Sequence, residues 1–207
     1  VDDSAGVAAR AAPVSIKTTI RDTAGSTVAT GTSPAITDFS KPILVTANAA
    51  SGVNYWTVQS PSLYTATVEI VSAGATVDSV NITTGVRTID FKADTGLYVN
   101  DVNIKMRGFC DHSSFAGVGA AVADRINLFR AQALRAVGGN AWRMAHNPPS
   151  PSRLSAMDAL GMLALDENRD YGGHPQQGGF TTETVADELH DMRDMIKRDR
   201  SHPSGMR

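Results

Sequence analysis

The sequence has 207 residues, of which 42 % are hydrophobic and 19 % charged, as in an ordinary folded globular protein. Its formal net charge of -2 gives no electrostatic reason to expect nucleic acid or an anionic membrane as a partner. No apolar stretch approaches the roughly 20 residues of a membrane-spanning helix, and no signal peptide is recognisable, so the compartment stays open. The single cysteine, Cys110, excludes an internal disulfide framework.

The first half of the chain has the pattern of a β-protein. Residues 1–12 are mostly small and are interpreted as an N-terminal extension, resembling a cut inside a longer gene product. Residues 13–93 contain short runs rich in Val, Ile and Thr, divided by turn signals about every ten residues. Every second residue from Tyr64 to Ile70 is apolar, which is typical of a half-buried strand. This spacing predicts an antiparallel sandwich of immunoglobulin type. Its predicted strands are 14–20, 26–30, 43–47, 64–71, 79–82 and 87–91.

From residue 94 to residue 207 strand and helix patterns alternate. The glycines at 138–139 and at 161 supply helix stops, and Ser150 with Pro151 supplies a helix start. The predicted strands are 102–109, 141–145 and 162–165, and the predicted helices are 126–137, 151–160 and a long one from about 182. This order requires a parallel sheet with right-handed crossovers. Three βα units cannot close a barrel that needs eight strands.

Six motifs, in this order and spacing, carry a resemblance to a known family. They are Trp56 with Ser60–Tyr64, Gly85–Arg87, Met106–His112, Gly139–Pro149, Asp158–Glu167 and Lys197–Ser204. Between Trp56 and Ser204 the chain resembles glycoside hydrolase family 2, the family of β-galactosidases, β-glucuronidases and β-mannosidases. The resemblance implies an immunoglobulin-like β-sandwich over residues 13–93, followed by a partial (βα)3 piece of a TIM barrel over residues 94–207.

The ancestral reaction implied by the resemblance is the retaining hydrolysis of terminal β-glycosides. That reaction uses two carboxyl groups about 5–5.5 Å apart. Family members supply both as glutamates that follow the His-Pro-Ser motif, and here that motif ends at Ser204. Adjacent strand residues point to opposite faces, so Asp166 and Glu167 do not replace the pair. We therefore expect a truncated hydrolase that is inactive or very weak as a glycosidase.

Functional groups of a parallel barrel lie at the C-terminal ends of its strands. The pocket or catalytic candidates at these ends are Asp111, His112, Arg143, His146, Asp166 and Glu167. By resemblance, His112, Arg143, His146 and Glu167 match positions that line the sugar pocket or support its carboxylates. A guanidinium is suited to binding a carboxylate, so Arg143 either serves the pocket or pairs with Asp166 or Glu167 and fixes the sheet.

Other polar residues are predicted to have structural roles. Cys110 is interpreted as a small packed residue, because no neighbouring base is indicated. His202 precedes a proline and is expected in a structural turn. Asp199 and Arg200 are expected at a solvated helix end.

Two other functional hypotheses stay open. The residues His112, His146, Asp166, Glu167 and His174 could bind a divalent metal, which would activate water against activated esters or phosphate esters. The resemblance to glycoside hydrolase family 2 does not itself imply a cofactor. Alternatively, the chain is a non-catalytic fragment that binds a carbohydrate or another small-molecule ligand, or that complements a missing half.

The incomplete barrel also suggests an assembly. A three-stranded parallel sheet exposes an edge and an apolar face. We therefore expect a homo-oligomer that forms through residues 100–200.

Overall fold

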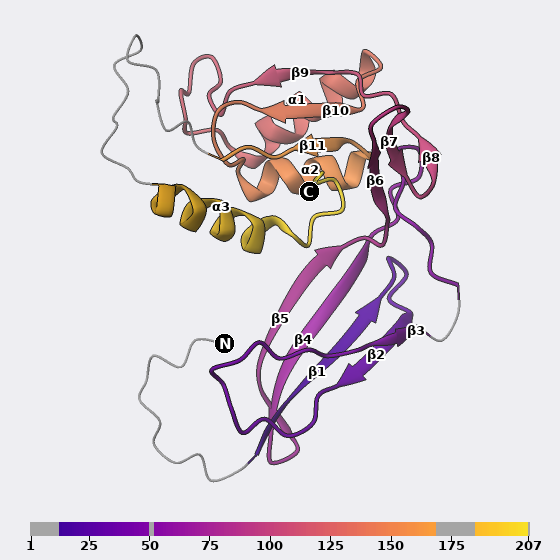
Figure 1. The fold of residues 1–207 in the computed structure, drawn as a ribbon, viewed down its shortest axis with the longest axis vertical. Helices are drawn as coiled ribbons and strands as arrows, with labels where there is room; N and C mark the ends of the chain where they lie inside the picture. The colour runs from indigo at the N-terminus through magenta and orange to yellow at the C-terminus, as the bar shows by residue number, and fades with distance from the viewer. Residues whose placement is uncertain (1–12, 50–51, 169–184, 207) are drawn as a thin grey trace. The chain divides into compact units, whose positions relative to one another are not determined.

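A computed structural model describes residues 13–49, 52–168 and 185–206 (Figure 1). The chain divides into two compact units that interleave in sequence. The first contains Val1–Asn54 and Leu63–Thr84, and the second contains Tyr55–Ser62 and Gly85–Arg207. Among the described residues, no helix is long and apolar enough to cross a membrane.

The first unit is built on one five-stranded antiparallel sheet with the strand order β3-β2-β1-β4-β5. Its strands are β1 Val14–Arg21, β2 Thr27–Thr32, β3 Asn48–Ala49, β4 Tyr64–Ser72 and β5 Ala75–Thr84. A two-residue turn at Ala73 and Gly74, both with positive φ, joins β4 to β5. Tyr64 is buried, and its hydroxyl accepts a hydrogen bond from the Asn54 N–H at 2.8 Å.

The strand predicted at residues 43–47 is not formed. Pairing on that side of the sheet begins only at β3, where Asn48 and Ala49 lie opposite Thr30 and Ala29 of β2. Leu44, the large apolar residue of the predicted run, is 87 % exposed. Ile43, Val45 and Ala47 are half-buried, so the predicted alternation of faces is present although the segment forms no ladder.

The second unit contains two small sheets. The strands β6 Ile89–Lys92, β7 Gly96–Val99 and β8 Val102–Asn103 form an antiparallel sheet. The strands β9 Gly108–Asp111, β10 Ala141–Met144 and β11 Leu163–Leu165 form a parallel sheet in the order β11-β10-β9. A parallel bridge between Ala164 and Gly205 adds residues near the C-terminus to the free side of β11. The parallel sheet predicted from the sequence is therefore confirmed.

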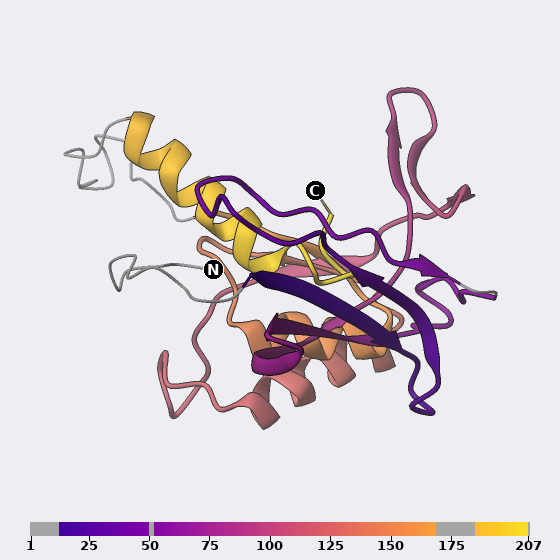
Figure 2. The ribbon, with the colours of Figure 1, turned by 90° about the horizontal axis from the view of Figure 1, so that it is seen from below.

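The helices α1 Asp124–Ala136 and α2 Pro151–Leu160 connect the parallel strands, and α3 Val185–Asp199 follows β11. The first two helices lie side by side (Figure 2) and share one buried cluster with Trp142 and Met144 of β10 and Ala164 of β11. Strand residues alternate between faces, so Arg143 points away from this helix layer.

The single strand predicted at residues 102–109 is instead two strands in different sheets. Residues 104–107 between them form no ladder. The Asn140 side chain replaces part of the ladder, because it accepts from the Arg107 N–H at 2.7 Å and donates to the Lys105 carbonyl at 3.0 Å. At Gly108 a Cβ would lie 1.7 Å from the Ala141 carbonyl oxygen, so only glycine allows β9 to approach β10 this closely.

Gly161 ends α2 with a φ of 66°, and an added Cβ would lie 2.3 Å from the Val58 carbonyl oxygen. We expect Gly161→Ala to lower the free energy of unfolding by about 3 kcal/mol through left-handed strain and backbone overlap. Gly117→Ala is the control, because the φ of Gly117 is 84° but nothing lies within 4 Å of the added Cβ. We therefore expect this variant to lose only about 1 kcal/mol of unfolding free energy. Urea unfolding followed by tryptophan fluorescence measures both, since the two tryptophans, Trp56 and Trp142, lie in the second unit. Equal losses of unfolding free energy in the two variants would contradict the close packing of Gly161 on the Val58 carbonyl.

Candidate functional site

A polar cluster lies at the C-terminal ends of β10 and β11. Arg143 is in β10, His146 follows it, and Glu167 lies two residues beyond β11. One carboxylate oxygen of Glu167, Oε1, accepts from Arg143 Nη2 at 2.8 Å and lies 3.0 Å from His146 Nδ1. Arg143 Nη2 and His146 Nδ1 are 3.3 Å apart. The parallel register of β10 and β11 therefore brings Glu167 against Arg143 and His146, which lie more than 20 residues earlier in the chain. We call these three residues the Arg143–His146–Glu167 cluster.

The cluster is accessible to a ligand. The side chains of Arg143, His146 and Glu167 are 36 %, 45 % and 25 % exposed. The second Glu167 oxygen, Oε2, is buried and has no hydrogen-bond partner among the described residues. A ligand at this face meets a cation, an imidazole and a carboxylate within one hydrogen-bond network.

Arg143 is held from two sides. Its Nη1 lies 3.5 Å from the Cys110 sulfur on the neighbouring strand. The pKa of the Arg143 guanidinium is raised above its ordinary value, first by the hydrogen bond to Cys110 and then by the charge of Glu167, so the group stays cationic. Cys110 itself is exposed, which makes its interpretation as a packed residue wrong.

His112 lies beside the cluster. Its ring centre is 5.3 Å from that of His146, with an angle of 80° between the planes. Asp111, the residue before it, contributes to a different contact, because its carboxylate accepts from Arg130 Nη2 of α1. Of the six sequence candidates, the structure therefore brings four together and turns Asp111 towards the helix layer.

The negative charge of Asp166 acts on a third cation, Arg198. Arg198 of α3 donates to the buried carboxylate of Asp199 at 2.7 and 2.8 Å. The pKa of Arg198 is raised, chiefly by that hydrogen bond and also by the negative charge of Asp166. The expectation that Asp199 is solvated is wrong, because Asp199 is 0 % exposed.

The three acidic candidates are thus distributed over three cations, Asp111 with Arg130, Asp166 near Arg198, and Glu167 with Arg143. Within the described residues, no group of three or more His, Cys, Asp or Glu side chains is arranged to hold a metal ion. His174, one of the nominated metal ligands, lies outside the described residues. The cluster can therefore orient a hydroxyl or carboxylate ligand through hydrogen bonds and charge.

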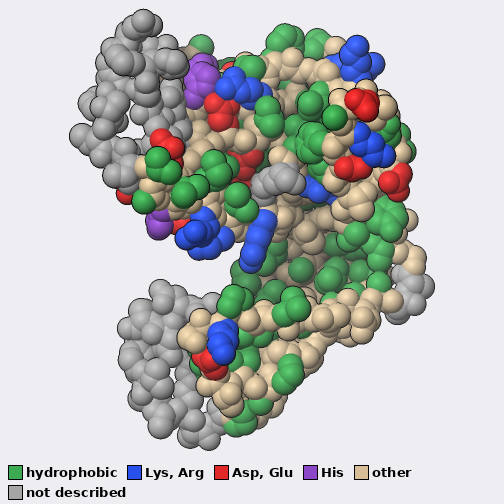
Figure 3. Space-filling view, in the orientation of Figure 1, with side chains coloured by type: hydrophobic (Ala, Val, Ile, Leu, Met, Phe, Trp, Pro, Cys, Tyr) green, Lys and Arg blue, Asp and Glu red, His purple; other side chains and the backbone are tan. Residues whose placement is uncertain are grey.

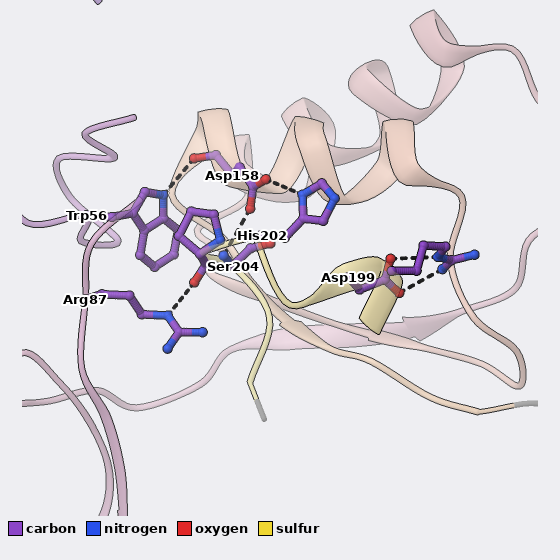
Figure 4. A network of polar contacts seen from close by, with 8 residues as sticks. Trp56, Arg87, Asp158, Asp199, His202 and Ser204 are labelled. Carbon is purple, nitrogen blue, oxygen red and sulfur yellow. Dashed lines mark hydrogen bonds and ion pairs between the residues drawn. The ribbon is translucent and has the colours of Figure 1, made fainter. Parts of the chain in front are cut away.

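A second polar network is centred on Asp158 of α2 and supports the parallel sheet on the side of β11 (Figure 4). The Asp158 carboxylate is 1 % exposed, lies 2.5 Å from His202 Nδ1 and accepts from the Ser204 N–H at 3.0 Å. Its backbone carbonyl accepts from the buried Trp56 indole at 2.8 Å. Arg87 donates to the carbonyls of Pro203, at 2.6 Å, and Gly205. The structural turn predicted for His202 has this physical basis.

This network places residues 204–206 beside β11. The Ser204 carbonyl accepts from the Ala164 N–H at 2.8 Å, and the Met206 N–H donates to the Ala164 carbonyl at 2.9 Å. From the sequence alone, Asp158 is singled out only as the first residue of the motif Asp158–Glu167. Its position on the helix, four residues after Leu154 and one after Met157, was the available signal, since a carboxylate on a buried face needs partners.

The sequence matches two profiles of one known protein family. The profile of "Glycosyl hydrolases family 2" matches residues 3–87, and that of "Glycosyl hydrolases family 2, TIM barrel domain" matches residues 91–206. The chain belongs to glycoside hydrolase family 2. The predicted fold class, a sandwich domain followed by part of a TIM barrel, is therefore confirmed.

Family 2 relatives are much longer than this chain. A putative β-glucuronidase of Formosa agariphila is 34 % identical over 151 residues, which are 72 % of this chain and 14 % of that protein. A β-galactosidase of Bacteroides ovatus is 29 % identical over 194 residues, covering 92 % of this chain and 23 % of that protein. The crystal structure of a β-glycosidase from Bacteroides vulgatus superposes with a TM-score of 0.82 at 29 % identity, over 94 % of this chain and 24 % of that one. The chain spans a quarter or less of each of these family 2 proteins.

We expect Asp158→Ala to lower the free energy of unfolding by about 3 kcal/mol, because it leaves His202 and the Ser204 N–H buried without their acceptor. Asp194→Ala is the matched control, since Asp194 on α3 is 53 % exposed and its loss should change stability by less than about 0.5 kcal/mol. Tryptophan fluorescence in a urea titration measures both variants. If the two substitutions lower the free energy of unfolding by the same amount, the Asp158 network does not hold residues 202–206.

Proposed function

We propose that these 207 residues form one side of the sugar pocket of a retaining β-glycosidase, and that they do not hydrolyse glycosides by themselves. The observation that carries this proposal is the convergence of Arg143 and His146 on Glu167 Oε1, at 2.8 and 3.0 Å. In a TIM barrel the strand C-terminal ends are where substrate groups are bound. Relatives named as β-glucuronidases and β-galactosidases support a carbohydrate as the ligand.

The chemistry supports a binding role without turnover. Retaining hydrolysis needs a nucleophilic carboxylate and a proton donor about 5–5.5 Å apart, facing one glycosidic bond. Glu167 belongs to the cluster, but Asp111 is paired with Arg130 on the helix side and Asp166 acts on Arg198. Glu167 is thus a single carboxylate, hydrogen-bonded to Arg143, where the reaction needs two that face each other. Arg143 therefore positions Glu167 or substrate oxygens, while the two reacting carboxylates would come from outside these 207 residues.

A metal-dependent hydrolase is the alternative proposal. The rings of His112 and His146 adjoin, and His146 contacts Glu167, so three of the five nominated ligands lie near one another. Glu167 and His146 are, however, already engaged with Arg143, whose positive charge opposes a cation at the same place. The glycosidase-derived proposal is therefore favoured.

A panel of chromogenic β-glycosides, esters and phosphate esters, each with and without chelator, tests these proposals. We expect no turnover of any substrate by the chain alone, with an intact family 2 β-galactosidase as the positive control. Glycoside turnover by the chain alone would contradict the proposed function, and ester or phosphate turnover that a chelator abolishes would favour the metal-dependent alternative.

Ligand binding gives a second readout that does not need turnover. Saturation-transfer NMR with phenyl β-glycosides should show contact with the chain, and Arg143→Ala should weaken the signal at least several-fold. Arg125→Ala, which removes an exposed arginine of α1, is the control.

We also propose that the chain self-associates through residues 100–200. Large apolar side chains are exposed on β9 and α1, and others gather over α3 (Figure 3). They include Phe109 at 67 %, Phe129 at 59 %, Val137 at 76 %, Val185 at 70 % and Leu189 at 56 % exposure. The apolar face predicted for α3 is thus present but uncovered, and apolar surface of this kind favours association.

Light scattering after size-exclusion chromatography measures the molar mass. We expect at least twice the mass of the 21.8 kDa chain, falling towards the monomer in the double variant Phe109→Ser and Phe129→Ser. Leu44→Ser is the control, because Leu44 is 87 % exposed in the first unit. A monodisperse monomer at high concentration would contradict self-association.

A further inference from the structure

The imidazole of His112 lies beside the Arg143–His146–Glu167 cluster without a hydrogen bond to hold it there. Its ring centre is 5.3 Å from that of His146, and the two planes make an angle of 80°. Within the residues that the structure describes, the imidazole forms no hydrogen bond and no ion pair. The position of this ring therefore depends on how the backbone of residue 112 is held.

The backbone carbonyl of His112 is held by two arginines from different helices. Arg130 of α1 donates to it through Nη2 at 2.8 Å, and Arg153 of α2 donates through Nη2 at 3.0 Å. Arg130 Nη2 also donates to the carboxylate of Asp111, so it contacts two consecutive residues at the end of β9. Hydrogen bonds from charged donors are stronger than those between neutral groups, and two of them on one oxygen restrict the peptide.

Both arginines are buried on the helix side of the parallel sheet. The side chain of Arg130 is 8 % exposed, and Arg153 is 2 % exposed. Their guanidinium carbons lie 5.4 and 4.8 Å from the centre of the Trp142 ring. Burying a guanidinium is costly, and an apolar side chain of similar length would fill the same space without that cost. Packing on Trp142 alone does not explain why arginine stands at both positions.

The hydrogen bonds of Arg153 indicate what its guanidinium does. Within the described part of the chain it forms no ion pair, its Nε has no hydrogen-bond partner, and its Nη1 reaches the Met144 sulfur at 3.6 Å, a weak acceptor. Burial, and then the charge of Arg130, lowers the pKa of Arg153 to about 10, so the group is still a charged donor at neutral pH. The His112 carbonyl is thus the one strong acceptor that Arg153 has among the described residues.

We propose that Arg153, together with Arg130, is a positioning residue that holds the His112 carbonyl and thereby places the His112 ring beside His146. Because the ring is placed through its backbone, both of its nitrogens remain available to donate to, or accept from, the hydroxyl groups of a ligand. The part of this inference that concerns a sugar rests on the proposed function. The placement of the ring does not depend on any ligand.

The test measures the contact between the two imidazole rings by NMR. The chain has five histidines, so the ring protons of His112 and His146 are assigned from the signals lost in His112→Gln and His146→Gln. We expect a nuclear Overhauser effect between the two rings in the parent chain. Arg153→Met keeps a side chain of similar length beside Trp142 but has no donor, so the effect should fall several-fold while the amide spectrum stays dispersed.

Arg135→Met is the matched control. Arg135 of α1 also donates to a backbone carbonyl, that of Val58 at 2.7 Å, and it does not contact His112, so the ring contact should persist. If Arg153→Met does not fold, Arg130→Met is the second variant and should weaken the ring contact in the same way. The proposal is overturned if the parent chain shows no ring contact, if the folded variant keeps it, or if Arg135→Met weakens it equally.

Saturation-transfer NMR with phenyl β-galactoside separates this inference from the proposed function. We expect Arg153→Met to weaken the signal of the ligand several-fold and Arg135→Met to leave it unchanged. Absence of any signal in the parent chain would contradict the proposed function, whereas the ring contact would still decide the role of Arg153. An unchanged signal in Arg153→Met, despite a lost ring contact, would overturn the link between His112 and the ligand.

Discussion

The burial of Asp158 is the constraint on which the second unit depends. A carboxylate that is 1 % exposed is stable only if its acceptors are occupied, and here His202 and the Ser204 N–H occupy them. The backbone carbonyl of the same residue receives the Trp56 indole. Two segments, one at Trp56 and one at residues 202–204, each more than 40 residues from Asp158 in sequence, are therefore fixed to one turn of α2. This explains why residues 55–62, which lie between strands of the first unit, belong by contact to the second.

Close backbone approach sets the second requirement of this unit. Gly108 allows β9 to lie against β10, and Gly161 allows α2 to end against the Val58 carbonyl. Both glycines belong to motifs that carried the family resemblance, and any side chain there would overlap backbone atoms. The position of the Arg143–His146–Glu167 cluster depends on these contacts, because the register of β9, β10 and β11 decides which residues meet at their C-terminal ends.

Much of the fold follows from local patterns, and the exceptions follow from contacts that no local pattern contains. The helical period and its stops predicted α1 and α2 closely, with Gly161 in the left-handed conformation as expected. The prediction of a single strand at 102–109 was wrong because the side chain of Asn140, more than 30 residues away, binds backbone groups between β8 and β9. Four of the six pocket candidates meet because strand C-termini converge in a parallel sheet. Asp111 differs because its carboxylate pairs with Arg130 of α1, a residue that none of the sequence motifs contains.

His112 connects the two polar regions of the second unit. Its ring lies against His146 of the Arg143–His146–Glu167 cluster, whereas its backbone carbonyl receives both Arg130 and Arg153 from the helix layer. A shift of either arginine would move the peptide that carries the ring, because the carbonyl and the side chain belong to one residue. The residue whose ring lies beside the Arg143–His146–Glu167 cluster is thus also the residue on which two buried arginines of the helix layer converge.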